Sequence, residues 1–164
     1  MPVSMNLARP SLEIPYLLQH MKRLCLKYGV DPQEIELEIT ETSLLHNVSH
    51  VQHFIESAKT LGFRCAIDDF GVGYSSLGCL HELTVDDIKF DRSFFVHLEK
   101  AKSRLIVRSM ARLAKMLGCT TVAEGIETRA QLDLLRGVEC DLVQGFVFYR
   151  PMTVEDFEKI AFEA

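Results

Sequence analysis

Six short extended runs alternate with amphipathic helical runs along the chain, and this alternation limits the possible folds more than any other sequence feature. The expected strands cover residues 3–7, 35–40, 63–67, 87–91, 121–124 and 141–148. Between them, apolar residues recur at helical spacing. Strands and helices that alternate in this way build a parallel sheet with helices packed outside it. The sequence therefore predicts a single α/β domain.

Hydroxyl residues and glycines mark the ends of the expected helices. These helices cover residues 12–28, 49–61, 103–117, 128–137 and 153–162. Ser103 is the expected N-cap of the long third helix. Thr128 and Gln131 form a capping-box pattern at the start of the fourth. Glycines follow the first three helices directly, as they commonly do at helix ends.

Composition and charge exclude several classes of function. With 164 residues, 48% of them hydrophobic, the chain has the size of one globular domain. Its net charge of −5 argues against nonspecific binding to nucleic acid or an anionic membrane. It has neither a signal-peptide run nor the ~20 apolar residues that span a bilayer. The five cysteines are scattered, so we expect reduced side chains and a cytoplasmic location.

Polar side chains interrupt strands that a fully covered parallel sheet would make apolar. Residues 35–40 alternate between apolar and polar side chains, which places Glu36, Glu38 and Thr40 on one face. The same alternation places Lys89 and Asp91 on one face of a later strand. A strand at the edge of the sheet, with one face in water, would explain the polar residues of a single strand. Because several strands share the pattern, we expect the polar groups to converge at the carboxyl-terminal face of a closed or nearly closed α/β barrel.

Two adjacent carboxylates, Asp68 and Asp69, end an apolar strand and precede a loop with Gly71 and Gly73. Neighbouring carboxylates repel each other, so a strand that ends in them offers them to water or to a cation. The glycines permit a sharp turn beside a bound group. A solvated turn explains this stretch equally well when it is considered alone.

Carboxylate and amide oxygens suit Mg²⁺ or Mn²⁺. The strand ends supply such oxygens from Asn6, Glu38, Asp68, Asp69 and Glu124. Two cations bridged by a carboxylate could activate a water and stabilise an in-line displacement at phosphorus.

Lys89 is the candidate that would position or deprotonate this water. Two nearby cations would disfavour its charge, which suits a base. A structural ion pair with Asp91 or Glu124 is the alternative explanation for the lysine.

A series of motifs along the chain resembles the EAL domain family, the metal-dependent phosphodiesterases of the bacterial second messenger cyclic di-GMP. The matching segments are Asn6-Leu7, Glu36-Leu37-Glu38-Ile39-Thr40-Glu41, Asp68-Asp69-Phe70-Gly71-Val72-Gly73-Tyr74-Ser75-Ser76-Leu77, Lys89-Phe90-Asp91-Arg92-Ser93-Phe94, Ala123-Glu124-Gly125-Ile126-Glu127-Thr128 and Gln144-Gly145-Phe146. Their order and spacing both fit the family, which makes the resemblance highly specific.

The resemblance implies a role for each motif residue. Asn6, Glu38 and Asp68 would bind a first Mg²⁺ or Mn²⁺, and Asp68, Asp69 and Glu124 a second. Lys89 would engage the catalytic water. Glu41 would steady the loop over residues 70–77, which in the family couples metal binding to dimer contacts. Asp91, Glu127 and Gln144 would support the metals or the substrate.

The chain also departs from the family. A TIM-type (β/α) barrel has eight strands, whereas about six are present here. We therefore expect an incomplete barrel, a single partial EAL domain over residues 1–164 that forms the carboxyl-terminal two-thirds of the family's domain. The Glu-Ala-Leu motif is missing, and with it one ligand of the first metal and a phosphate-binding arginine. Two open sheet edges predict a homodimer or larger assembly.

Three accounts fit this pattern. The chain is a piece of a longer phosphodiesterase with fused sensory or diguanylate-cyclase domains, an inactive relative that binds cyclic di-GMP or a protein partner, or a structural module with a residual acidic face. Retention of the catalytic residues favours the first.

Overall fold

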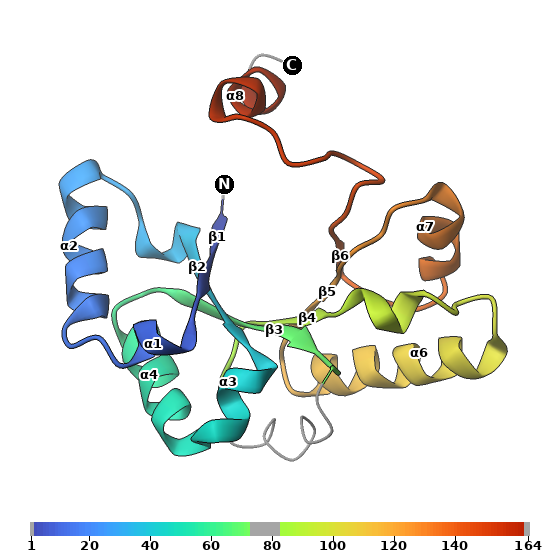
Figure 1. The fold of residues 1–164 in the computed structure, drawn as a ribbon, viewed down its shortest axis with the longest axis horizontal. Helices are drawn as coiled ribbons and strands as arrows, with labels where there is room; N and C mark the ends of the chain where they lie inside the picture. Colours follow the sequence, from blue (N-terminus) through green and yellow to red (C-terminus); the bar gives the residue numbers. More distant parts are fainter. Residues whose placement is uncertain (1, 73–82, 163–164) are drawn as a thin grey trace.

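The computed structural model describes residues 2–72 and 83–162, and their strands form one parallel sheet. Six strands lie side by side in chain order, from β1 to β6, as the alternation predicted (Figure 1). They are β1 (Val3–Leu7), β2 (Ile35–Thr40), β3 (Arg64–Phe70), β4 (Asp87–Phe90), β5 (Thr120–Ala123) and β6 (Leu142–Val143). All pairs are parallel, so the carboxyl ends of the strands lie at one edge. No described helix is long and apolar enough to cross a membrane.

Helices connect the strands and pack outside the sheet, except α8, which stands apart from it (Figure 1). They are α1 (Arg9–Leu12), α2 (Leu17–Tyr28), α3 (Glu41–His46), α4 (Val48–Thr60), α6 (Ala101–Met116), α7 (Arg129–Leu135) and α8 (Val154–Phe162), with 3₁₀ turns η1 (Pro32–Glu34) and η2 (Arg92–Phe95). Ile39, Ile67 and Ile88 are completely buried, and so are Ala58 of α4 and Ala111 of α6. The apolar core therefore lies between the sheet and these helices.

Several sequence predictions about element bounds were wrong. The strand expected over residues 63–67 continues through Asp68 and Asp69 as part of β3. The helix expected over residues 12–28 begins only at Leu17, as α2, because Tyr16 takes a left-handed conformation before it, and α1 ends at Leu12. Ser103 lies inside α6, which begins two residues earlier after Lys100. The last strand is only Leu142–Val143, because Gly145 passes so close to the Ile126 backbone that the chain leaves the sheet there. The capping box of Thr128 and Gln131 is confirmed.

The inner face of the sheet is open. Pro2 and Ser4 at one edge and Leu142 and Val143 at the other line the same cavity of about 440 Å³. The sheet is therefore curled like part of a barrel wall, as the family resemblance implied. Among the described residues, β1 and β6 each pair with only one strand, so the curl ends in two open edges.

Asp141 connects the entry of β6 to β5 and gives a test of the sheet's stability. Its Oδ2 accepts hydrogen bonds from the Thr121 amide (2.9 Å) and hydroxyl (2.7 Å), and Lys115 Nζ lies 3.0 Å from Oδ1. Burial opposes ionisation of Asp141, but these partners outweigh it and lower the pKa.

We expect Asp141→Asn to reduce the free energy of unfolding by about 1 kcal/mol near pH 7. A carboxyl group whose pKa is lowered by folding stabilises the protein at pH values above its unfolded-state pKa. The difference in unfolding free energy between Asp141→Asn and wild type should therefore shrink as the pH falls below about 4. Urea titrations of both proteins at pH 7 and pH 3.5 measure this difference in unfolding free energy. Asp133→Asn, which removes an exposed carboxylate, is the control. Equal effects of the two substitutions at pH 7 would contradict the assignment.

Candidate active site

Three parallel strands bring Asn6, Glu38 and Asp68 together. Asn6 lies opposite Glu38 in the β1–β2 register, and Asp68 lies opposite Thr40 in the β2–β3 register. β2 lies between β1 and β3, so the explanation of its polar residues by a wet edge strand is wrong. The convergence of polar groups at the strand ends, predicted from the alternation, is present for these three residues.

Lys89 of β4 lies at the centre of the carboxylates. Its Nζ is 2.6 Å from both Glu38 Oε1 and Glu124 Oε1, and 3.8 Å from Asp68 Oδ1. Lys89 and Glu38 are each only 4% exposed, so these ion pairs are shielded from water. Burial alone would lower the pKa of Lys89, but hydrogen bonds from Lys89 to Glu124 and Glu38 raise it above its ordinary value.

The ion-pair alternative for Lys89 therefore holds for Glu124. The expectation of a less charged lysine concerns a site that holds two cations, and it stays a prediction.

The Asn6 amide has two useful orientations beside this cluster. With Nδ2 turned inward, it donates 3.2 Å hydrogen bonds to Asp68 Oδ2 and Glu38 Oε2. With Oδ1 turned inward, oxygens from three strands face one another, and oxygens are the donors that a hard cation prefers. Asn6, Glu38 and Asp68 thus fit the first predicted metal site.

Asp68, Asp69 and Glu124 form a second group of oxygens. One carboxylate oxygen from each lies within 4.8 Å of the others. Burial and the charge of neighbouring Asp68 raise the pKa of Asp69, and burial raises that of Glu124 despite its bond with Lys89. Asp69 also has φ +52°, a left-handed conformation uncommon outside glycine. Crowded carboxylates beside a strained position near the end of β3 fit a divalent cation, which would relieve their repulsion.

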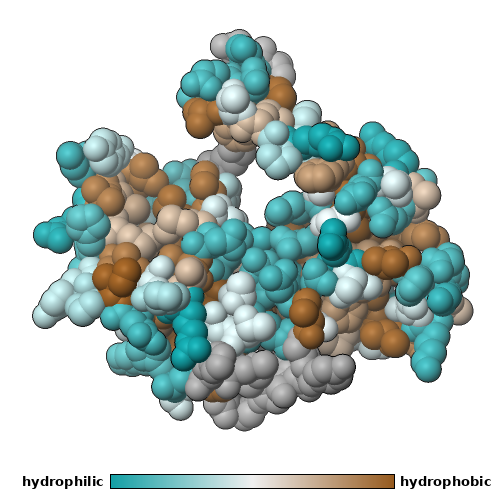
Figure 2. Space-filling model, viewed as in Figure 1, coloured by the Kyte–Doolittle hydropathy of each residue, from teal (hydrophilic) through white to brown (hydrophobic). Residues whose placement is uncertain are grey.

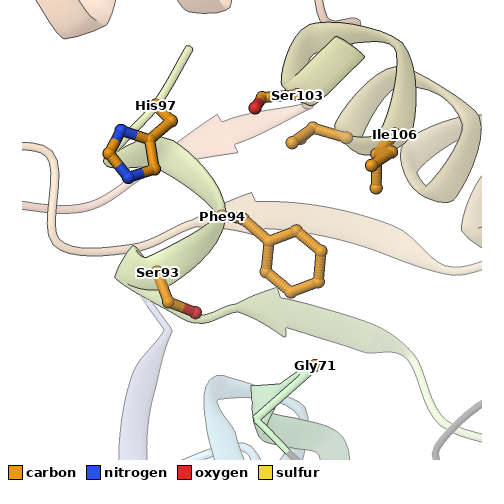
Figure 3. Close-up of a pocket in the computed structure, with 7 residues that line it drawn as sticks. Gly71, Ser93, Phe94, His97, Ser103 and Ile106 are labelled. Carbon is orange, nitrogen blue, oxygen red and sulfur yellow. The ribbon is translucent and has the colours of Figure 1, made fainter. Parts of the chain in front are cut away.

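Glu41 ties the end of β2 to the end of β3. Its Oε2 accepts a 2.7 Å hydrogen bond from the Gly71 amide, and Glu41 is almost completely buried. Gly71 has φ +100°, and a Cβ there would lie 1.9 Å from Phe94 Cε2. Figure 3 shows the Phe94 ring beside Gly71 in a pocket of about 270 Å³. This hydrogen bond agrees with the expected role of Glu41 for residues 70–72 of the loop motif. Residues 73–77 of the motif lie outside the described residues.

The remaining candidates lie around the cluster. Asp91 accepts a hydrogen bond from the Ser93 amide and caps η2, which lowers its pKa although burial opposes this. Glu127 and Gln144 line a cavity of about 260 Å³ together with Glu124. This cavity provides space for a ligand directly beside the carboxylates.

Sequence reasoning missed two residues of this cavity, Arg92 and Phe146. Arg92 packs over Gly125, where an added Cβ would lie 2.5 Å from Arg92 Cβ. The sequence signal was the position of Arg92 directly after Asp91, in the motif that begins with Lys89.

Comparisons with known proteins show the family of the chain. The family model of the EAL domain matches residues 1–151. The cyclic di-GMP phosphodiesterase NbdA of Pseudomonas aeruginosa is 35% identical over 158 residues, which cover 96% of this chain and 20% of that protein. The bifunctional diguanylate cyclase/cyclic di-GMP phosphodiesterase MucR of the same organism is 32% identical over 93% of this chain and 22% of its own length. The chain thus spans about a fifth of these relatives.

Solved structures show the same fold. The EAL domain of Mycobacterium smegmatis DcpA has a TM-score of 0.89 at 31% identity, over 99% of this chain and 74% of that one. The Klebsiella pneumoniae BlrP1 complex with manganese and cyclic di-GMP has a TM-score of 0.86 at 33% identity, over 92% and 39%.

Gly71→Ala tests the contact that fixes the end of β3. We expect a loss of unfolding free energy at least about 1 kcal/mol larger than that of Gly118→Ala. Gly118 is a matched control because it also has a positive φ (+80°) but has no atom within 4 Å of an added Cβ. Urea titrations measure both variants. Equal losses would show that the contact of an added Cβ with Phe94 does not add to the loss of stability.

Proposed function

The chain belongs to the EAL domain family, and on this premise we propose that it is a metal-dependent phosphodiesterase domain that hydrolyses cyclic di-GMP to linear pGpG in bacterial signalling. The observation that carries the proposal is the cluster of Asp68, Asp69 and Glu124 around the buried Lys89. The chain would be one partial domain, the carboxyl-terminal two-thirds of the family's domain, over residues 1–164.

Mg²⁺ or Mn²⁺ would be held by Asn6, Glu38 and Asp68 in a first site and by Asp68, Asp69 and Glu124 in a second. Such cations supply charge neutralisation at phosphorus and lower the pKa of water. Lys89 would orient the attacking water and accept its proton. Glu38 and Glu124 would turn from Lys89 to the cations, which removes the two interactions that raise the lysine pKa.

The cavity beside Glu124 would receive the nucleotide. Arg92 offers a planar set of donors that suits a phosphate or a guanine edge. Gln144 and Glu127 supply an amide and a carboxylate for the base or ribose. Glu41 would keep Gly71, and through it Asp69, in place.

A second candidate is a catalytically inactive domain that binds cyclic di-GMP or a protein partner. The open edges of β1 and β6 favour it, because unpaired parallel strands are ready to bind another polypeptide. Among the described residues, the first metal site has three side-chain ligands, fewer than a hard cation takes.

The proposal extends to partners and location. The name of MucR combines cyclase and phosphodiesterase activities, so a fused sensory or diguanylate-cyclase domain fits a longer parent protein. A homodimer or larger assembly would cover the open edges. The described cysteines are all free thiols, which fits the reducing cytoplasm.

The first test is hydrolysis of cyclic di-GMP with Mg²⁺, Mn²⁺ or neither. We expect pGpG only with a metal, and a decrease in kcat of about 10²-fold or more for Lys89→Ala. Chromatography of the products measures both. Lys59→Ala, which removes a surface lysine from its pair with Asp86, is the control. Binding of cyclic di-GMP without turnover by a folded sample would favour the second candidate instead.

Arg92→Ala tests the nucleotide cavity. We expect the Kd for cyclic di-GMP, measured by calorimetry with Ca²⁺, to rise about tenfold, since a charge-assisted pair contributes about 1–3 kcal/mol. Arg92→Lys should recover part of the affinity. An unchanged Kd would exclude Arg92 from the site.

A further inference from the structure

A cavity of about 300 Å³ lies at the amino ends of the strands, at the opposite edge of the sheet from the carboxylate cluster. Its lining residues are Gln33, Lys59, Gly62, Phe63, Arg64 and Asp86. They come from η1 before β2, from the end of α4, from the chain that leads into β3, and from the residue before β4. The proposed hydrolysis uses none of these residues, so the cavity is free for another role.

Cationic side chains from three elements converge on this cavity. Lys59 of α4 and Arg64 of β3 line it, and Lys22 Nζ of α2 lies 3.9 Å from the position of a Cβ added to Gly62. α2 carries basic residues and no carboxylate. Figure 2 shows hydrophilic side chains at the left edge of the molecule, where Figure 1 places α2. Positive charge therefore gathers at this edge although the whole chain has a net charge of −5.

The negative charge at the cavity does not balance these cations. Asp86 is the only carboxylate among the described residues that line it. Asp86 Oδ1 lies 2.7 Å from Lys59 Nζ, and Oδ2 accepts a 2.9 Å hydrogen bond from the Cys65 amide, so both oxygens are engaged. Lys22 forms no ion pair within the described part of the chain. At least one ammonium group is thus left for an anion.

Arg64 adds further donors. Its guanidinium contacts Asp87 through Nη2, and its Nε lies 3.7 Å from Glu36 Oε2. A guanidinium has five N–H donors, and the side chain of Arg64 is 39% exposed. Arg64 can therefore donate to an anion in the cavity while it keeps its two carboxylate partners.

Gly62 leaves the space that the anion needs. It has φ +94°, and an added Cβ would come no closer than 3.5 Å to Pro32 Cβ. A longer side chain at this position would extend toward Lys22 Nζ and take up that space. The missing side chain thus keeps the ammonium group open to the cavity.

We propose that this cavity binds a phosphate dianion between Lys22, Lys59 and Arg64, with the Gln33 amide as a further donor. A tetrahedral dianion accepts hydrogen bonds from several directions, which suits cations that come from three different elements. The volume also leaves room for a small group attached to the phosphate, so free phosphate and a phosphomonoester share the chemistry. The site goes beyond the proposed hydrolysis, because it requires neither divalent cation nor the carboxylate cluster.

Titration of the ¹⁵N-labelled chain with sodium phosphate at pH 8, followed by NMR, tests the proposal. We expect saturable shifts of the Gln33, Gly62 and Arg64 amide signals with a Kd below about 10 mM. Lys22→Gln/Lys59→Gln should raise the Kd about tenfold or more, because it removes two charge-assisted donors. Asp86→Asn should lower the Kd, because it releases Lys59 and removes a repelling carboxylate. A general loss of structure would not change the Kd in opposite directions.

Controls separate the site from general charge effects. Lys115→Gln is matched to the lysine variants, because Lys115 also pairs with an aspartate and its side chain is 39% exposed, against 34% for Lys59. It should bind phosphate as wild type does, and NaCl of equal ionic strength should cause no saturable shift. Circular dichroism checks that each variant is folded. A second titration with ribose 5-phosphate distinguishes the sources, because tighter binding than that of inorganic phosphate identifies a phosphomonoester.

Three results would overturn the proposal. They are the absence of saturable shifts, shifts centred on Arg92 rather than Gly62, and an unchanged Kd in the folded double lysine variant. Turnover of cyclic di-GMP in phosphate-free buffer should be the same for Lys59→Gln and wild type. A loss of one activity without the other therefore shows which of the two proposals has failed.

Discussion

The buried charge of Lys89 organises the carboxyl-terminal edge of the sheet. A desolvated ammonium group is tolerated only with close partners, and Lys89 finds them in Glu38 of β2 and in Glu124, which follows β5. These groups come from elements on both sides of β4, so the lysine fixes the spacing of strand ends that otherwise carry mutually repelling carboxylates. The same repulsion is what makes the edge suited to cations. The lysine is therefore a positive charge that holds the acidic site together.

A second polar layer lies on the inner face of the sheet, toward the amino ends of the strands. Ser4 donates a 2.8 Å hydrogen bond to Glu36, and Arg64 contacts both Glu36 and Asp87. Burial, together with a hydrogen bond to Asp87, raises the pKa of Glu36 to about 7. This layer connects four strands through side chains where a closed barrel would have packed interior. An open cavity lies beside this layer and is lined by residues of both edge strands.

The sequence predicted the parts of this molecule that depend on local pattern. Alternation in residues 35–40 correctly placed Glu38 on the inner side of a strand, and parallel topology then implied that Asp68 and Asn6 would lie near it. Features that depend on packing between distant segments were not predictable in this way. Arg92 enters the cavity only because Gly125 leaves room for its Cβ, and the strand after Asp141 is cut short by contact with Ile126. Ser103 was misplaced because α6 begins without any side-chain cap.

The contact between Gly125 and Arg92 restricts substitutions at position 125 more than substitutions at position 92. Position 125 is fixed by the backbone and side chain of its neighbour, so almost any replacement there disturbs the fold. Position 92 contributes its Cα, Cβ and Cδ to that contact, and the residue as a whole is exposed. Substitutions at position 92 can therefore change ligand preference without changing the fold. Proteins with the same carboxylates at the same strand ends can in this way recognise different ligands.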